Sequence, residues 1–259
     1  MMTLLLLAQA DYVEAMAKVA RRFRGTEGVV LHIGDSITHA NPYGAWARHG
    51  RGKTPEDVAI CRWMRVGEDN EKDGFYLARV DLPGGRGETA VGGIQTREWL
   101  TGGKAGAPPL EELIKRFQPR MAVVLLGTND VKNGRSTGDT AADLGRIVDL
   151  LTSHGAIPIL STIPPMKGKD AEVAALNREI LEIVRAKRIP HIDYHAEIVK
   201  RRPADWLGTL ISDDGVHPSA GPDAAAEPTE ENLKNSGYLL RGWLSVRKIA
   251  EVKAKVLDR

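Results

Sequence analysis

The chain has 259 residues, of which 42% are hydrophobic and 27% charged, and its formal net charge is +2. These values are typical of a globular protein with an ordinary core, and so small a net charge gives no general attraction to nucleic acid. The single cysteine, Cys61, excludes an intrachain disulfide and a metal site built from several thiolates, and no run of 18 apolar residues predicts a membrane span.

The first ten residues allow two interpretations. Residues 4–10 are apolar and end in an Ala-x-Ala pattern, which is typical of a signal peptide and its cleavage site. The basic segment that normally precedes such a core is missing, so the same residues could open the first helix instead. A signal-peptide remnant at 1–10 would place the protein in the periplasm or outside the cell, whereas without one we expect a cytoplasmic protein.

Helical and strand patterns alternate along residues 11–259. In chain order we expect a helix over 11–24, a strand over 29–33, a helix that begins at 55, two strand segments over 75–82 and 89–91 around a glycine-rich loop, a helix over 108–117, a strand over 121–126, a helix over 139–154, a strand over 157–160, a helix over 170–188, a strand over 189–193 and a helix from about 236. The helix at 55 has a strong start, with Thr54 as its N-cap and Pro55 at its first position. Such alternation predicts an α/β fold, with a parallel sheet and helices on both faces.

Polar residues follow two of the expected strands. Gly34-Asp35-Ser36 comes directly after the strand over 29–33, and Gly127-Thr128-Asn129-Asp130 follows the strand over 121–126. In open parallel sheets, sites form outside the carboxyl ends of the strands. The late loop around His217 could fold back over the same edge, so we expect a site there.

Ser36, His217 and Asp214 have the chemistry of a nucleophilic serine site. A serine hydroxyl needs a base to take its proton, and His217 is the best base among the seven histidines. Asp214 lies three residues earlier, so one turn can bring its carboxylate to the imidazole and fix its tautomer. Asp213 is an alternative partner. The structural alternatives are an N-cap or turn serine and a loop histidine bonded to its neighbouring aspartate.

Asn129 and Gly93 are candidates for an oxyanion hole. The amide of Asn129 and the backbone N–H groups of Gly93 and Ser36 could donate to the negative charge that develops on an acyl oxygen. Asn129 could instead close an Asx turn, and glycine pairs such as Gly92-Gly93 are common in loops.

These segments together resemble the SGNH hydrolase superfamily, also called the GDSL family. The matching blocks are Gly34-Asp35-Ser36-Ile37, Val91-Gly92-Gly93-Ile94-Gln95-Thr96, Gly127-Thr128-Asn129-Asp130 and Asp214-Gly215-Val216-His217-Pro218. The first has Ile where the family name has Leu, and the second is a loose match. The resemblance spans about 28–222 and implies a flavodoxin-like three-layer α/β/α sandwich with a central, mostly parallel five-stranded sheet. It also implies a Ser–His–Asp triad that needs no cofactor or metal.

The chain departs from the family pattern in two places, an insertion at about 41–89 and a helical extension at about 231–259 of an otherwise single domain. Both could shape the substrate pocket. A metal site at His32 and His39 is conceivable, but their spacing fits no common ligand pattern and we expect His32 to face the core or a neighbouring helix. The tryptophans near the insertion could stack on a sugar or pack in the core; these are Trp46, Trp63 and Trp99.

The sequence therefore predicts a serine esterase that acts through an acyl-enzyme, on a small-molecule or carbohydrate ester rather than on nucleic acid. Short acyl groups such as acetyl on a carbohydrate are the favoured substrate. A lipid or thioester hydrolase and an O-acyltransferase use the same intermediate and are the near alternatives. A non-catalytic ligand-binding domain of the same fold is the alternative from another class.

Overall fold

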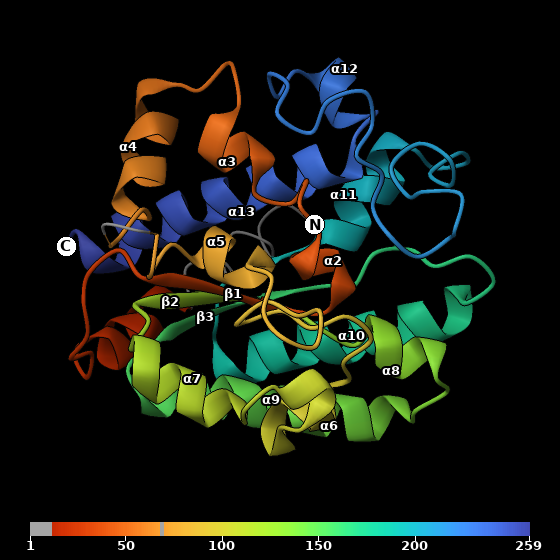
Figure 1. The fold of residues 1–259 in the computed structure, drawn as a ribbon. Coiled ribbons are helices and arrows are strands. Elements are labelled where there is room, and N and C mark those ends of the chain that lie inside the picture. The colour runs from red at the N-terminus through yellow and green to blue at the C-terminus, as the bar shows by residue number, and fades with distance from the viewer. Residues whose placement is uncertain (1–11, 68–69) are drawn as a thin grey trace.

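A computed structural model describes residues 12–67 and 70–259 (Figure 1). The predicted signal-peptide remnant at 1–10 lies outside the described residues. The first helical segment covers 12–20 and is followed by turns, so it is shorter at its C-terminal end than the predicted helix over 11–24.

A parallel sheet of four strands forms the centre of the molecule. The strands are β1 (Val30–Gly34), β2 (Met121–Leu125), β3 (Ile157–Ser161) and β4 (His191–Ile192), and they pair in the order β1-β2-β3-β4. Every residue of the first three strands is buried. This burial explains their mostly apolar sequences, because helices cover both faces of a parallel sheet.

The expectation of a fifth strand is wrong for the described residues. Residues 89–91 run beside β1 but make only one parallel bridge, between Ala90 and Gly34. Two backbone hydrogen bonds hold this bridge, from Gly34 N–H to Thr89 O and from Val91 N–H to Gly34 O. The turn at Gly92-Gly93 then takes the chain away, so the pairing cannot extend into a strand.

Helices cover both faces of the sheet (Figure 1). Their bounds are α2 (Ser36–His39), α3 (Ala45–His49), α4 (Pro55–Trp63), α5 (Gly74–Arg79), α6 (Thr96–Thr101), α7 (Leu110–Phe117), α8 (Thr128–Lys132), α9 (Thr137–Ser153), α10 (Asp170–Lys187), α11 (Tyr194–Arg201), α12 (Glu230–Leu233) and α13 (Gly237–Val252), with a 3₁₀ turn at Lys104–Gly106 and a π-helical turn at Lys253–Leu257. In Figure 1, α6, α7, α9 and α10 lie below the sheet, and α3, α4, α5 and α13 lie above it. The three-layer α/β/α expectation is therefore confirmed.

Helix α4 begins where the sequence predicted. Thr54 caps it by accepting from the Asp57 N–H, and Asp57 accepts from the Thr54 N–H in return, which completes a capping box. The helix ends at Trp63, and Cys61 lies buried on its inner face.

The predicted strand over 75–82 is wrong, because this segment begins with helix α5. Asp73 caps α5 by accepting from the N–H groups of Phe75 and Tyr76. Gly74 allows the helix to lie against β1, since a Cβ at Gly74 would lie 1.7 Å from the Val30 carbonyl oxygen. The local cap and this close approach decide the structure of a short apolar run that fits either helix or strand.

Candidate active site

Ser36 is the first residue of α2, directly beyond the carboxyl end of β1. Asp35 caps this four-residue helix, and its Oδ1 accepts a hydrogen bond of 2.9 Å from the Ile37 N–H. Gly34 makes room for α2, since a Cβ at Gly34 would lie 2.0 Å from Oγ1 of Thr38. Because N–H groups in the first turn of a helix have no intrahelical acceptor, Ser36 can present both its hydroxyl and its N–H to a ligand.

The structure brings Ser36, His217 and Asp214 together. Ser36 Oγ lies 2.8 Å from His217 Nε2, although the two residues are 181 positions apart. On the other side of the ring, His217 Nδ1 lies 2.6 Å from Asp214 Oδ2. Asp214 rather than Asp213 therefore contacts the imidazole. The resulting order of hydroxyl, imidazole and carboxylate is the one needed to activate a serine.

The loop that carries His217 is held by its own backbone. Asp214 Oδ1 accepts from the N–H groups of Val216 and His217, and the His217 carbonyl accepts from the N–H of Ser212 at 2.8 Å. Gly215 has a positive φ of 75°, which a residue with a side chain would adopt only with strain. These contacts orient the imidazole before any ligand binds.

The carboxylate of Asp214 is stabilised in its charged form. Partial burial by itself would raise the pKa of Asp214, but hydrogen bonds from Val216 N–H and from the ring and N–H of His217 outweigh this effect. The pKa of Asp214 consequently lies below its ordinary value. The side chains of His217 and Asp214 are 37% and 50% exposed, so this part of the site is open to solvent.

Asn129 lies beside Ser36, in α8 at the end of β2. Gly127 has a φ of 114° and turns the chain between β2 and α8. The Asn129 Nδ2 lies 3.2 Å from Asp35 Oδ2 and 3.2 Å from the Ile94 carbonyl oxygen. Asn129 is therefore joined both to the residue before Ser36 and to the residue after Gly93.

Gly93 occupies the turn that follows the bridge to β1, with a φ of 73°. A hydrogen bond of 2.8 Å from Thr96 Oγ1 to Asp130 Oδ1 fixes this turn to α8, and Arg135 Nη1 donates to the same carboxylate oxygen at 2.9 Å. Asp130 thus connects the second and third sequence blocks. All five predicted site residues lie on segments that these contacts link.

Asp35 is a completely buried carboxylate within this arrangement. Burial raises its pKa to about 6, and the Ile37 N–H and the charges of Arg241 and His217 limit the rise. Its two oxygens accept from Ile37 and Asn129. Asp35 therefore organises the candidate nucleophile segment and the candidate oxyanion donor at the same time.

His32 faces the core, as expected. Its ring stacks on Phe75 with 3.9 Å between ring centroids, and its Nδ1 lies 2.8 Å from the Tyr43 hydroxyl. Burial, aided by the charge of Arg241, lowers the pKa of His32 to about 3, so the imidazole is neutral at ordinary pH. Across residues 12–67 and 70–259, no three His, Cys, Asp or Glu side chains are grouped so as to hold a metal ion.

Sequence reasoning did not identify Arg241. This residue of α13 is only 3% exposed, and its guanidinium reaches α2, where it donates to the Ile37 carbonyl and to Thr38 Oγ1 at 2.8 Å each. In the sequence, Arg241 is one cation in a helix that alternates apolar and polar residues. Its contact with α2 depends on tertiary packing, so no local pattern could have revealed it.

The tryptophans near the insertion do not form an aromatic surface for a sugar. Trp46 and Trp99 are 1% and 0% exposed, and the indole N–H of Trp99 donates to the Gly34 carbonyl. Trp63 is half-buried, with the Lys253 ammonium 5.5 Å from the centre of its ring. Core packing, the simpler of the two interpretations, accounts for Trp46 and Trp99.

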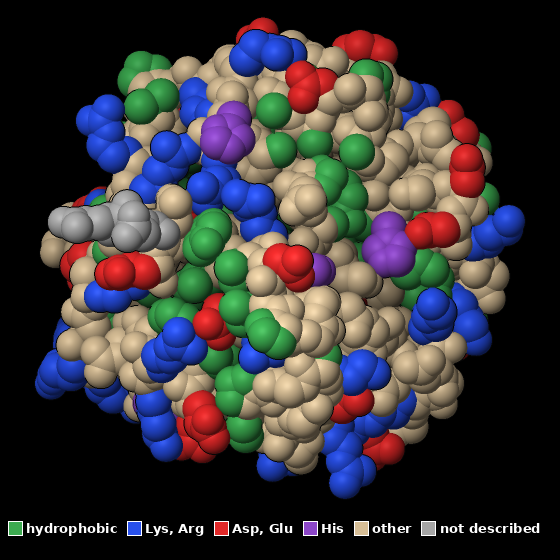
Figure 2. Space-filling model, viewed as in Figure 1, with side chains coloured by type: hydrophobic (Ala, Val, Ile, Leu, Met, Phe, Trp, Pro, Cys, Tyr) green, Lys and Arg blue, Asp and Glu red, His purple; other side chains and the backbone are tan. Residues whose placement is uncertain are grey.

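Positive charge instead gathers over α3 and α5, within residues 41–89 (Figure 2). Burial and the neighbouring charges of Arg48, Arg65, Arg79 and Lys53 together lower the pKa of His49. Arg48 is paired with Asp73 at 2.6 Å. This surface would favour anionic groups on any ligand that reaches it.

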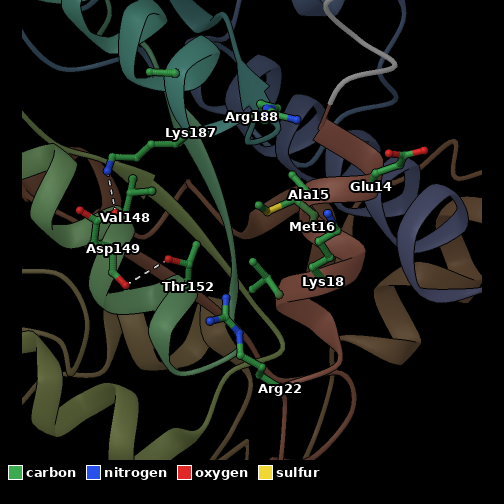
Figure 3. A pocket seen from close by; sticks show the side chains of 12 residues that line it. Glu14, Ala15, Met16, Lys18, Arg22, Val148, Asp149, Thr152, Lys187 and Arg188 are labelled. Carbon is green, nitrogen blue, oxygen red and sulfur yellow. Dashed lines mark hydrogen bonds and ion pairs between the residues drawn. The ribbon is translucent and has the colours of Figure 1, made fainter.

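A cavity of about 400 Å³ lies away from the five predicted site residues (Figure 3). It lies between helical segment 12–20, α9 and the end of α10, and an ion pair of 2.6 Å between Lys187 and Asp149 crosses one side of it. None of the predicted site residues lines this cavity, and none lines a second cavity of about 230 Å³ beside Arg135 and Leu176.

The profile of the GDSL-like lipase/acylhydrolase family matches residues 32–221. The chain therefore belongs to this family, and it is a hydrolase of the family. The resemblance inferred from the four sequence blocks is confirmed. No curated protein matches the sequence.

Solved structures share the fold at low sequence identity. A carbohydrate esterase of family 3 from Talaromyces cellulolyticus is 17% identical, with a TM-score of 0.57, and the match covers 88% of this chain and 98% of that one. An acetylxylan esterase from Geobacillus stearothermophilus, solved as a catalytic mutant, is also 17% identical, with a TM-score of 0.55 and coverage of 88% and 96%. A lipase/acylhydrolase from Enterococcus faecalis is 19% identical, with a TM-score of 0.54 and coverage of 86% and 95%.

Helices long and apolar enough to cross a membrane are absent from the part of the chain that the structure describes.

Proposed function

We propose that this protein is a serine esterase that hydrolyses short acyl esters, such as acetyl groups on a carbohydrate, through an acyl-enzyme. The observation that carries the proposal is the continuous contact from Ser36 Oγ to His217 Nε2 at 2.8 Å and from His217 Nδ1 to Asp214 Oδ2 at 2.6 Å. Such an order of groups is needed to remove a proton from a serine hydroxyl as it attacks.

In the first half of the reaction, Ser36 Oγ attacks the acyl carbonyl carbon while its proton moves to His217 Nε2. The negative charge that develops on the carbonyl oxygen is stabilised by the N–H groups of Ser36 and Gly93 and by the Asn129 amide. The imidazolium then gives its proton to the leaving alkoxide as the ester C–O bond breaks. This step leaves the acyl group on Ser36.

In the second half, the oxygen of a water molecule attacks the acyl carbon while His217 takes a proton from that water. The same three donors stabilise the second oxyanion. The bond to Ser36 Oγ breaks, the proton returns to that oxygen, and the free carboxylic acid leaves. Asp214 remains ionised throughout and stabilises the imidazolium form of His217.

Two observations favour a small acyl group on a larger alcohol. His217 and Asp214 are open to solvent, and such an open site can take a bulky leaving group more easily than a deeply buried site can. Two structures of the same fold are described as a carbohydrate esterase and an acetylxylan esterase, which makes acetylated sugars the first natural substrates to test. The positive charge over α3 and α5 extends that test to acetylated sugars that carry carboxylates.

Initial rates on p-nitrophenyl esters of increasing chain length test the proposal. We expect rates to fall beyond butyrate, and we expect Ser36→Ala and His217→Ala to lower kcat by several orders of magnitude, as observed for such residues in serine hydrolases. Asp214→Ala should lower kcat less, by about 10²–10⁴-fold, and Asp213→Ala is its matched control. If Asp213→Ala were the damaging change and Asp214→Ala silent, the assigned carboxylate would be wrong.

The other functions predict different results. Release of long-chain fatty acid without acetate from acetylated sugars would indicate a lipid hydrolase. Faster product formation when a sugar acceptor is added would indicate an acyltransferase, which uses the same acyl-enzyme. A folded wild-type protein whose Ser36 does not react with a fluorophosphonate would indicate a binding domain.

A further inference from the structure

Arg241 connects α13 to the short helix that carries the candidate nucleophile. Its Nη1 donates to the Ile37 carbonyl and its Nη2 donates to Thr38 Oγ1, both at 2.8 Å. The guanidinium also lies over the ring of Tyr43, 3.7 Å from its centre. Stacking and two directed hydrogen bonds leave the planar group little freedom.

Burying the charged side chain of Arg241 costs more folding free energy than an ordinary structural contact requires. The side chain is 3% exposed, and its guanidinium donates to two neutral acceptors, the Ile37 carbonyl and Thr38 Oγ1, rather than to a carboxylate. A buried charge that is not directly paired lowers stability unless hydrogen bonds compensate for the lost hydration. The charge of Arg241 nevertheless acts on Asp35, whose carboxylate lies at the opposite end of α2.

Helix α2 depends on contacts at its two ends. A helix of four residues is too short to be stable by itself. The Asp35 carboxylate caps its N-terminal end, and the Arg241 guanidinium binds a carbonyl near its C-terminal end. Negative charge at the first end and positive charge at the second both complement the helix dipole.

We propose that Arg241 is a positioning residue for Ser36: it holds α2 in the orientation that keeps the Ser36 hydroxyl at His217 and the Ser36 N–H directed to the acyl oxygen. Thr38 transmits this effect, because its side chain lies between Gly34 on one side and the Arg241 guanidinium on the other. The inference rests on the esterase function proposed above and adds to it a residue outside the four sequence blocks.

The test compares Arg241→Met and Arg241→Lys with the wild-type enzyme at a temperature well below the Tm of each protein. Turnover of p-nitrophenyl acetate and the rate of fluorophosphonate labelling at Ser36 are both normalised to folded protein. Displacing a reacting group by about 1 Å can lower the rate 10²-fold, so we expect Arg241→Met to lower kcat and the labelling rate by about that factor. KM should change less than threefold, and Arg241→Lys should recover part of the lost rate.

Arg120→Met is the matched control. Arg120 likewise donates to a backbone carbonyl, that of Ala20, and lies over an aromatic ring, with 4.5 Å to the centre of Phe23. It lies just before β2, at the opposite end of the sheet from Ser36. We expect Arg120→Met to lower the Tm while leaving kcat per folded molecule within twofold of wild type.

Thr38→Val provides a second variant if Arg241→Met does not fold. It removes one acceptor of the guanidinium, and we expect a threefold to tenfold loss of kcat that does not add to the loss in Arg241→Lys. Folded variants that label Ser36 at the wild-type rate, with only the Tm lowered, would overturn the positioning role. A wild-type protein that neither turns over esters nor reacts at Ser36 would overturn the esterase function itself, and the positioning role with it.

Discussion

The Nδ2 atom of Asn129 lies 3.2 Å from Oδ2 of Asp35, so a buried carboxylate links the residue before Ser36 to the candidate oxyanion donor. The same nitrogen lies 3.2 Å from the Ile94 carbonyl, and the two contacts use both amide hydrogens. An oxyanion could therefore be bound only if one contact is given up. Because Asp35 is ionised at neutral pH and accepts more strongly, we expect the contact with Ile94 to be the one that breaks.

This relationship predicts the effect of changing Asn129. Asn129→Ala should lower kcat by about 10²–10³-fold with a smaller effect on KM, because one proposed oxyanion donor is lost. The exposed Asn133, which follows α8, offers a control, and Asn133→Ala should leave kcat unchanged. The structure of a phosphonate adduct would show the Asn129 amide turned toward the phosphonyl oxygen. An adduct in which Asn129 still bonds Ile94 would remove it from the oxyanion hole.

Asp35 should make stability depend on pH. Its pKa is about 6 in the folded protein against 3.8 for the unperturbed group, so the folded state holds the proton more tightly. Stability from this proton is fully present below about pH 4 and is lost as the pH rises through 6, to a total of about 3 kcal/mol. Asp35→Asn removes this loss. Urea unfolding should therefore show the free energy of unfolding of Asp35→Asn rising relative to that of wild type between pH 4 and pH 7. A difference between the two proteins that does not change with pH would contradict the raised pKa of Asp35.

His32 should act in the opposite direction. Its pKa falls from 6.5 to about 3 on folding, so the unfolded chain takes up the proton first as the pH is lowered. The stability that comes from keeping His32 neutral in the folded protein is fully present above pH 6.5. It is lost as the pH falls toward 3, by about 3 kcal/mol at pH 4. In His32→Asn this loss is absent. The free energy of unfolding of wild type should consequently fall toward that of the variant on acidification, and parallel curves would show that His32 does not titrate as described.

Gly34 should tolerate no side chain. A Cβ at this position would lie 2.0 Å from Thr38 Oγ1 and 2.5 Å from Thr38 Cβ, so Gly34→Ala must displace α2. Overpacking of this kind costs typically about 1–3 kcal/mol, and here it would also slow the phosphonate reaction at Ser36. Gly138→Ala is the control, because a Cβ on that α9 residue meets nothing within 4 Å. Equal unfolding midpoints and equal labelling rates for the two variants would contradict the close fit of α2 against β1.

The sheet and the positions of the candidate site residues in the fold could be predicted from sequence because their signals are local. The three longer strands are mostly apolar runs whose predicted limits differ from the observed ones by at most one residue, and the N-terminal start of α4 is encoded by Thr54 and Asp57 alone. Ser36 and Asn129 stand directly after such strands, so the parallel topology was enough to place them at one edge.

Other features depend on packing that no local pattern contains. The run that begins at Phe75 is apolar enough for a strand, and it becomes helical because Asp73 caps it and Gly74 fits against the backbone of β1. Helices α2 and α8 are too short to produce a periodic signal. The contact between Arg241 and Ile37 joins residues 204 positions apart, and only the folded structure brings them together.

The contact between α13 and α2 also sets an order of folding steps. All four strands precede α13 along the chain, so during synthesis they emerge from the ribosome before the helix that holds α2. Contacts between residues so far apart in sequence form slowly, because a large loop must close first. The strands can thus pair while Ser36 still lacks its fixed position. During refolding, reactivity at Ser36 should therefore appear after the spectroscopic signal of sheet formation. The newly made chain would gain its ability to attack esters only at the last stage of its own folding.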